Sequence, residues 1–136
     1  MATNDFNNKV IAEFRANGGK VGGPFEGRPV LLLTTQGART GKTRVNPLVY
    51  LADGDRMYVF ASKAGGLTSP DWYHNLVANP DVPVEIGTDT VQIKATVVTG
   101  PDRDTVYATQ AAANPVFAEY AAKTTRTIPV VALDRK

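Results

Sequence analysis

Short apolar runs separated by turn residues limit the folds that are open to this chain. Residues 82–86 and 91–98 alternate apolar and polar side chains on either side of the turn Gly87-Thr88-Asp89. Such alternation places the apolar residues on one face of a strand, and a short glycine-containing turn joins two strands as an antiparallel hairpin. The turn Asp53-Gly54-Asp55 predicts a second hairpin, between residues 44–51 and 57–61. Strands joined by hairpins rather than by helical crossovers favour a closed or nearly closed antiparallel barrel.

Two further apolar runs, residues 30–35 and 128–133, have the length of strands. Proline cannot donate a hydrogen bond to a ladder, so Pro47 requires its strand to lie at a sheet edge or to carry a bulge. Together the strands predict a mainly β protein of the α+β class.

Helical segments accompany these strands. Residues 4–17 predict an amphipathic N-terminal helix, because its apolar side chains fall on one face: Phe6, Val10, Ile11 and Phe14. Ser69-Pro70-Asp71 offers a cap, a first-turn proline and an acidic residue, so we expect a short helix at 72–78. Two more helices are expected, one before and one after the break Asn114-Pro115. The chain is then one domain, with a helix at 1–17 and a barrel at 18–136.

Composition excludes several classes of function. A formal charge of +2 over 136 residues is too small and too dispersed for a nucleic-acid binder. Because the chain has no cysteine and one histidine, His74, it lacks the ligands of iron–sulfur clusters and of nearly every zinc site, and we expect no metal. No apolar run approaches the roughly 18 residues that span a bilayer, and no signal peptide is present, which predicts a cytoplasmic protein. Redox chemistry therefore requires a bound organic cofactor.

The segment Gly37-Ala38-Arg39-Thr40-Gly41-Lys42-Thr43 resembles a phosphate-binding P-loop. It is one residue short, and a strand-like segment containing Pro47 follows it where a P-loop needs a helix, so a nucleotide triphosphatase is disfavoured. The composition still suits an anion, because the glycines let backbone amides converge while Arg39, Lys42 and Arg44 add positive charge. An exposed hairpin turn that is basic for solubility is the alternative, and the segment alone does not decide between them.

Other candidate residues have both a functional and a structural interpretation. Ser62 and Lys63 follow a strand end, where barrels often bind ligands, although an ordinary strand end explains them as well. Trp72 suits stacking on a flat ring or burial in the core, and Phe117 and Tyr120 suit a pocket wall or helix packing. Arg126 is a structural ion-pair residue or another anion contact, and His74 is expected at the surface.

Jointly, five blocks of sequence resemble the deazaflavin-dependent nitroreductase family of actinobacteria. The likeness extends from about Phe14 to the run Arg126-Thr127-Ile128-Pro129. The blocks are Leu-Leu-Thr-Thr-Gln-Gly-Ala-Arg-Thr-Gly from Leu32, Arg44-Val45-Asn46-Pro47-Leu48, Ala61-Ser62-Lys63, Pro70-Asp71-Trp72-Tyr73-His74-Asn75-Leu76 and Ala78-Asn79-Pro80.

The resemblance implies an antiparallel split β-barrel, similar to barrels that bind flavin mononucleotide, which holds coenzyme F-420. This cofactor is a deazaflavin with a phosphate and an oligoglutamate tail. By the resemblance, the residues that match basic positions for the phosphate and tail are Arg39, Thr40, Lys42 and Arg44, in the segment shaped by Gly37 and Gly41, and Lys63, which follows a later strand end. Those that match the ring pocket are Asn46, Pro47, Ala61, Ser62, Trp72 and Asn75.

The resemblance also implies hydride transfer from the reduced deazaflavin to an electron-poor acceptor, such as a quinone, a nitroimidazole or another conjugated compound. The walls of the acceptor pocket would be formed by Val49, Asn114, Phe117 and Tyr120. Tyr50, next to Val49, would lie on the other face of their strand. Ser62 or Tyr120 would bind the acceptor and supply a proton. Alternatives are a flavin- or heme-binding barrel oxidoreductase and a non-catalytic deazaflavin carrier.

Quinones dissolve in lipid, so the apolar face of the N-terminal helix suits weak contact with the inner face of the cell membrane as well as core packing. The sequence leaves a monomer and a homodimer both open.

Overall fold

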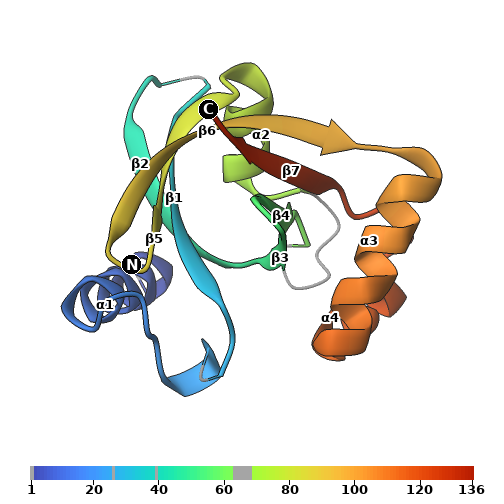
Figure 1. Cartoon of the computed structure of the whole chain (residues 1–136), viewed down its shortest axis with the longest axis horizontal. Helices are drawn as coiled ribbons and strands as arrows, with labels where there is room; N and C mark the ends of the chain where they lie inside the picture. The colour runs from blue at the N-terminus through green and yellow to red at the C-terminus, as the bar shows by residue number, and fades with distance from the viewer. Residues whose placement is uncertain (1, 26, 39, 63–68) are drawn as a thin grey trace.

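The computed structural model describes residues 2–25, 27–38, 40–62 and 69–136, and the side chains of residues 2–6 and 24 are outside this description. In this part of the chain, seven strands form one curled antiparallel sheet, in the order β2-β1-β5-β6-β7-β4-β3 (Figure 1). The strands are β1 (Val30–Gln36), β2 (Thr43–Val49), β3 (Leu51–Asp53), β4 (Arg56–Phe60), β5 (Asp81–Ile86), β6 (Asp89–Val98) and β7 (Val130–Arg135). The mainly β, antiparallel split-barrel prediction is confirmed.

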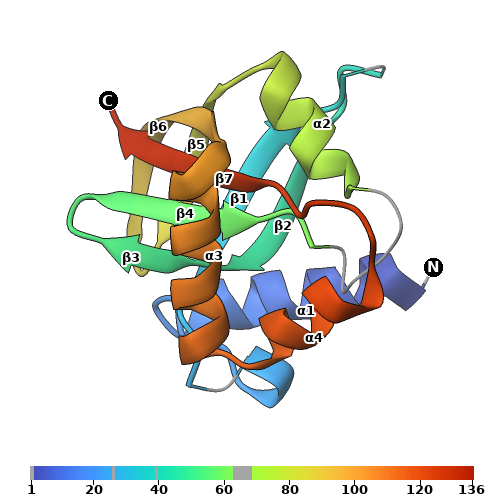
Figure 2. The ribbon, with the colours of Figure 1, turned by 90° about the vertical axis from the view of Figure 1, so that its right-hand side faces the viewer.

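Four α-helices and one short 3-10 helix pack around the sheet. They are α1 (Ala2–Ala16), η1 (Gly23–Phe25), α2 (Asp71–Ala78), α3 (Gly100–Ala113) and α4 (Val116–Lys123). Figure 2 shows α3 and α4 together on one side of the sheet, with α2 near the tip of the β1–β2 hairpin. The four predicted helices and the β5–β6 hairpin are therefore confirmed, with small shifts at their ends.

The strand β1 is buried on both faces, which explains its unbroken apolar sequence. Leu31 and Leu33 point into the main core of the half-barrel, together with Trp72 of α2. The alternate residues of β1, Val30 and Leu32, pack with Phe14 of α1. Each such burial contributes about 1.5–3 kcal/mol relative to exposure.

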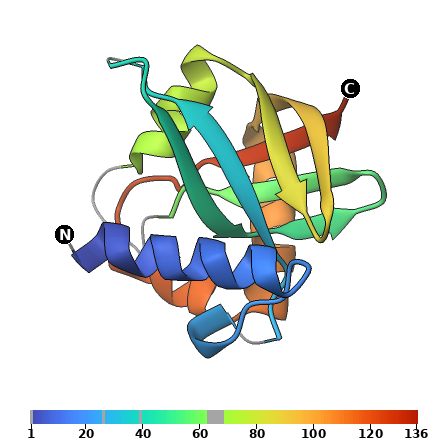
Figure 3. The same ribbon diagram turned by 90° about the vertical axis from the view of Figure 1, so that its left-hand side faces the viewer.

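The N-terminal helix α1 lies across the β1–β2 hairpin (Figure 3). Val10 and Phe14 are buried, at 7% and 1% exposed, and Ile11 packs against the same cluster. This part of the predicted apolar face is therefore used in packing, the interpretation that competed with membrane contact. Among the described residues, no helix is both long and apolar enough to cross a bilayer.

The predicted hairpin between residues 44–51 and 57–61 is wrong over most of its length. Strand β2 pairs with β1 along its full length, from Val30↔Val49 to Gln36↔Thr43. The chain leaves this ladder at Tyr50, whose N–H donates to the carbonyl of Pro29 at 3.1 Å. Only the three residues of β3 then pair with β4. The expected place for Pro47 is correct, because β2 is an edge strand.

The predicted cap of helix α2 is also wrong. The N-cap residue is Pro70, and no side chain caps the helix. The hydroxyl of Ser69 instead accepts a hydrogen bond from Nη1 of Arg126 at 3.3 Å. The Ser69 oxygen, which the local sequence predicts as the helix cap, thus bonds to an arginine that is far away in the sequence.

Candidate functional site

The loop between β1 and β2 is closed by its own backbone. The N–H of Gly37 donates to the carbonyl of Lys42 at 2.8 Å, and the N–H of Gly41 donates to the carbonyl of Gly37 at 2.9 Å. Gly41 has φ +71°, a conformation that favours glycine. A Cβ at Gly37 would lie 2.7 Å from Oγ1 of Thr40. The two glycines are therefore needed for a compact turn.

Four amides of this loop do not converge on an anion, contrary to expectation. Besides Gly37 and Gly41, the N–H of Ala38 donates to Oδ1 of Asn75 at 2.9 Å and that of Lys42 donates to Oγ1 of Thr40 at 3.3 Å. The predicted contact Arg39 lies outside the described residues. These four amides are therefore not available to an anion, whereas the side chains of Thr40, Lys42, Thr43 and Arg44 are exposed.

Two cations of this hairpin, Lys42 and Arg44, have no ion-pair partner among the described residues. In the described part of the chain, the ion pairs involve Arg15, Arg56, Arg103 and Lys136, and neither Lys42 nor Arg44 has a carboxylate within 4 Å. Two unpaired positive charges two residues apart attract anions from solution. This is the electrostatic property that the sequence predicts for the loop.

Asn75 of α2 holds the loop in place. Its side-chain amide is buried, at 6% exposed, and bonds in two directions. Nδ2 donates to the hydroxyl of Thr35 at the end of β1, at 3.2 Å, and Oδ1 accepts from the amide of Ala38. The sequence patterns did not single out Thr35, although a hydroxyl at the end of an apolar run, two residues before the glycine at the start of a loop, is a usable signal.

The exit of strand β4 is fixed by Arg126. Nη2 of Arg126 donates to the carbonyls of Ala61 and Ser62, at 3.0 and 2.9 Å. The N–H of Ala61 donates to the carbonyl of Pro129 at 3.0 Å. These bonds hold the backbone at Ser62, a predicted catalytic residue that is 9% exposed, while Lys63 lies outside the described residues.

The predicted acceptor-pocket residues meet in an aromatic cluster. The Phe117 ring is 6% exposed and makes edge contacts with Phe60 and Tyr120, at centroid distances of 5.3 and 5.4 Å. Val49 and Tyr120 are partly buried against this cluster. Asn114, at the end of α3, accepts a hydrogen bond from the N–H of Phe117 at 3.1 Å. We call these four residues, Val49, Asn114, Phe117 and Tyr120, the aromatic end.

The two tyrosines next to Phe117 differ in their environment. The Tyr107 hydroxyl donates to the carbonyl of Phe117 at 2.6 Å, and burial raises the pKa of Tyr107. That hydroxyl is committed to joining α3 and α4. Tyr120 is half-buried at the edge of the cluster. Tyr50 packs against the main core instead, so the expectation that it lies on the other face from Val49 is correct.

The remaining predicted ring-pocket residues lie on β2 and α2. Asn46 pairs with Leu33 and Pro47 with Leu32, and both are partly exposed. Trp72 is 6% exposed within the main core, where packing accounts for it. Contact between these three residues and a ring stays a prediction.

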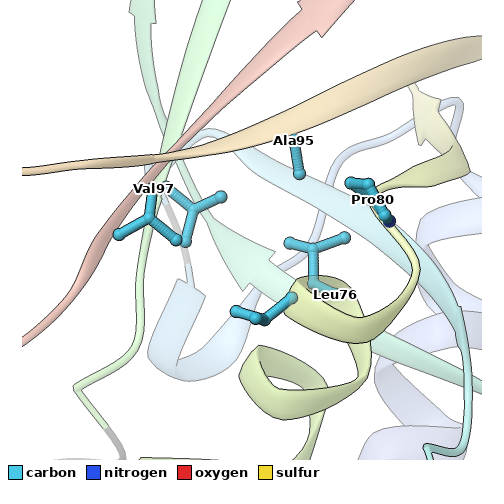
Figure 4. A pocket seen from close by; sticks show the side chains of 6 residues that line it. Leu76, Pro80, Ala95 and Val97 are labelled. Carbon is cyan, nitrogen blue, oxygen red and sulfur yellow. The ribbon is translucent and has the colours of Figure 1, made fainter.

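The polar and aromatic ends of the candidate site are joined by β2. Arg44 is the second residue of this strand and Val49 ends it, five residues later, which corresponds to about 16 Å at the rise of an extended chain. A different hollow of about 170 Å³, between α2 and β6, is lined by apolar residues such as Leu76 and Val97 (Figure 4). Its lining side chains lack polar groups, so it offers no chemistry for an anion.

Comparison with known proteins identifies chains that are similar to this one. A family model described as F420H(2)-dependent quinone reductase matches residues 7–135. An F420H(2)-dependent quinone reductase of Mycobacterium tuberculosis is 40% identical over 130 residues, which cover 92% of this chain and 87% of the relative. A solved F420-H2 dependent reductase (FDR-A) superimposes with a TM-score of 0.71 at 37% identity, covering 79% of this chain and 95% of that one. Another solved chain, described as a domain-swapped dimer, gives a TM-score of 0.73 at 32% identity, with 98% and 100% covered.

Proposed function

The chain belongs to the family of F420H(2)-dependent quinone reductases, and we propose from this premise that it transfers a hydride from reduced coenzyme F-420 to a quinone or another electron-poor acceptor. The observation that carries the proposal is the composition of β2, which begins beside two cations that have no ion-pair partner among the described residues and ends in an aromatic cluster. A cofactor with an anionic tail and a conjugated ring system has the same division between charged and apolar parts.

The donor set fits such a cofactor. Lys42 and Arg44 are exposed and unpaired among the described residues, and charge-assisted hydrogen bonds to phosphate or carboxylate are the strongest polar contacts that these side chains make. We assign them, with Arg39, Thr40 and Lys63, to the phosphate and tail. Asn75 contributes indirectly, because it fixes the loop through Ala38.

When bound, the reduced deazaflavin supplies the hydride, and the protein orients the reactants. The aromatic end offers an apolar wall for a conjugated acceptor and excludes water from it. The hydroxyl of Tyr120, or that of Ser62, would donate a hydrogen bond to the acceptor oxygen and supply the proton that a reduced quinone requires. The proposal extends to nitro compounds, which need the same hydride and proton.

Binding and turnover test the proposal separately. Purified protein is titrated under anaerobic conditions with reduced coenzyme F-420, flavin mononucleotide and heme, and the bound reduced cofactor is then mixed with menadione in a stopped-flow instrument. We expect tight binding of the deazaflavin and its rapid oxidation. Binding of flavin mononucleotide or heme alone contradicts the cofactor assignment. Deazaflavin binding without oxidation across a panel of acceptors indicates a carrier protein.

We place the reaction in the cytoplasm, with the acceptor reached from the aqueous side. The buried Val10 and Phe14 leave less of the α1 face for a lipid surface than the sequence suggests. Co-sedimentation with anionic lipid vesicles tests this, and retention of the protein by vesicles would restore a peripheral membrane role. Light scattering distinguishes a monomer from a homodimer.

A further inference from the structure

A polar hollow of about 260 Å³ lies between the N-terminal helix and the edge strand. Residues of α1 form one side of it and the first half of β2 forms the other. Its lining consists of Asn7, Asn8, Thr43, Arg44, Val45 and Asn46. The predicted cofactor residues Arg44 and Asn46 therefore share this space with two asparagines that neither the sequence patterns nor the family resemblance assigns.

The position of the asparagines follows from helix geometry. Asn7 lies four and seven residues before Ile11 and Phe14, which places all three on one face of α1. Ile11 and Phe14 pack in the cluster that includes Val45 and Val49 of β2. The same face that is apolar farther along the helix thus presents an amide where it passes the start of β2. Asn7 is half-buried there and Asn8 is exposed.

The polar side chains that line the hollow favour the binding of an anion. Asparagine amides and the Thr43 hydroxyl are hydrogen-bond donors, Arg44 adds a full positive charge, and none of the described side chains that line the hollow is acidic. Arg44 has no carboxylate partner among the described residues. A bound oxyanion would therefore gain a cation and several neutral donors, and the described lining contains no negative charge that would repel it.

The size of the hollow limits what it holds. Its volume is several times the ~30 Å³ share of a water molecule and below the ~300–1,000 Å³ of pockets that enclose whole drug-sized ligands. It has room for one acidic group with its immediate neighbours.

We propose that this hollow is a subsite for one oxyanion of the cofactor's tail, a phosphate or a glutamate carboxylate, and that Asn7 and Asn8 of α1 help to bind it. The inference rests on the proposed function and adds the N-terminal helix to the cofactor site. It makes α1 a part of the binding machinery as well as a cover for the sheet.

Calorimetric titration with three deazaflavins tests the subsite. The ligands are a deazaflavin without phosphate or tail, one with the phosphate alone, and one with phosphate and several glutamates. For the Asn7→Ala/Asn8→Ala variant we expect about tenfold weaker binding of the ligand that carries the recognised oxyanion, and unchanged binding of the bare deazaflavin. A loss that begins with the phosphate form identifies the phosphate, and a loss confined to the glutamate form identifies a carboxylate.

Two further variants control for folding. Asn17→Ala makes an asparagine-to-alanine change just beyond the other end of α1 and should bind all three ligands like wild type. Asn7→Asp keeps the side-chain shape but places a carboxylate beside Arg44, so it should weaken only the binding of anionic forms. If the alanine pair does not fold, the aspartate variant gives the answer alone.

The subsite is overturned if neither the alanine pair nor Asn7→Asp changes the ratio of affinities for tailed and bare deazaflavin, or if the wild-type protein binds both forms equally. Failure of wild-type protein to bind any deazaflavin is a different result, because it removes the proposed function and the subsite together.

Discussion

The two ends of strand β2 are built in opposite ways. At the start of the strand, Lys42 and Arg44 are exposed and have no acidic partner among the described residues. At its end, Val49 meets a cluster in which Phe60 and Phe117 are each 6% exposed. Binding is thus assigned to side chains that contribute little to stability, while the acceptor wall is part of the packing of α4. Substitutions at the two ends should therefore affect stability and ligand binding in different proportions.

The largest expected effect is the loss of stability from Phe117→Ala. The ring contacts Phe60, Tyr107 and Tyr120, and truncation of a buried phenylalanine costs about 3–5 kcal/mol of unfolding free energy. Urea unfolding monitored by circular dichroism measures this. A cost below about 1 kcal/mol would show that the aromatic end is not part of the core, and would contradict the difference between the two ends of β2.

The second largest effect is expected for Asn75→Leu, which should lower both the unfolding free energy and the affinity for the cofactor. It removes both hydrogen bonds of the buried amide and leaves the hydroxyl of Thr35, 2% exposed, without its partner, at a cost of about 1–3 kcal/mol. Because Ala38 loses its anchor, we also expect cofactor affinity to fall about tenfold. Urea unfolding and calorimetric titration give the two values. A stability loss with unchanged affinity would show that the loop does not need this anchor.

Tyr120→Phe should separate chemistry from packing at the aromatic end. The ring contact with Phe117 remains, so the unfolding free energy should change by less than about 0.5 kcal/mol. If its hydroxyl supplies the proton, turnover with menadione should fall by about 10²-fold or more, with cofactor affinity unchanged. Ser62→Ala is the matched comparison, and normal turnover in Tyr120→Phe would transfer the role to Ser62.

The smallest effect is a pH dependence that comes from Tyr107. Burial raises the pKa of this phenol above its ordinary value of 10.0, so the unfolded chain loses the proton first as the pH rises. The contribution of Tyr107 to the unfolding free energy is fully present below pH 10 and declines above it, by less than about 1 kcal/mol between pH 10 and 11. Unfolding of wild type and Tyr107→Phe across this range should show a shallower decline in the variant. Parallel curves would contradict the assignment.

Local patterns predicted the elements whose determinants lie within a few residues. Alternation around Gly87 gave the β5–β6 hairpin, and the break at Asn114-Pro115 separated α3 from α4. The division of residues 44–51 was missed because the strand-like pattern continues through Tyr50, whereas the partner changes there, from β1 for residues 43–49 to β4 for residues 51–53. The cap at Ser69 was missed for the same reason, since its partner Arg126 is 57 residues away.

The candidate site was predicted in composition more than in arrangement. The sequence grouped Lys42 with Arg44 and, by resemblance, Val49 with Phe117 and Tyr120, and the structure brings each group together. It did not reveal that the loop amides bond within the protein or that Asn75 anchors them, because those partners lie up to 40 residues apart. Long-range hydrogen bonds leave no periodic signal in a sequence.

The central claim is that positive side chains on the β1–β2 loop bind the anionic part of the cofactor. The most direct measurement is the dissociation constant of glutamate-tailed deazaflavin for Arg39→Gln/Lys42→Gln/Arg44→Gln, beside wild type and beside the bare deazaflavin. We predict about 100-fold or greater weakening for the tailed ligand, no change for the bare one, and an unfolding free energy within about 0.5 kcal/mol per substitution of wild type. Equal affinity of the variant and the wild type for the tailed cofactor would contradict the account.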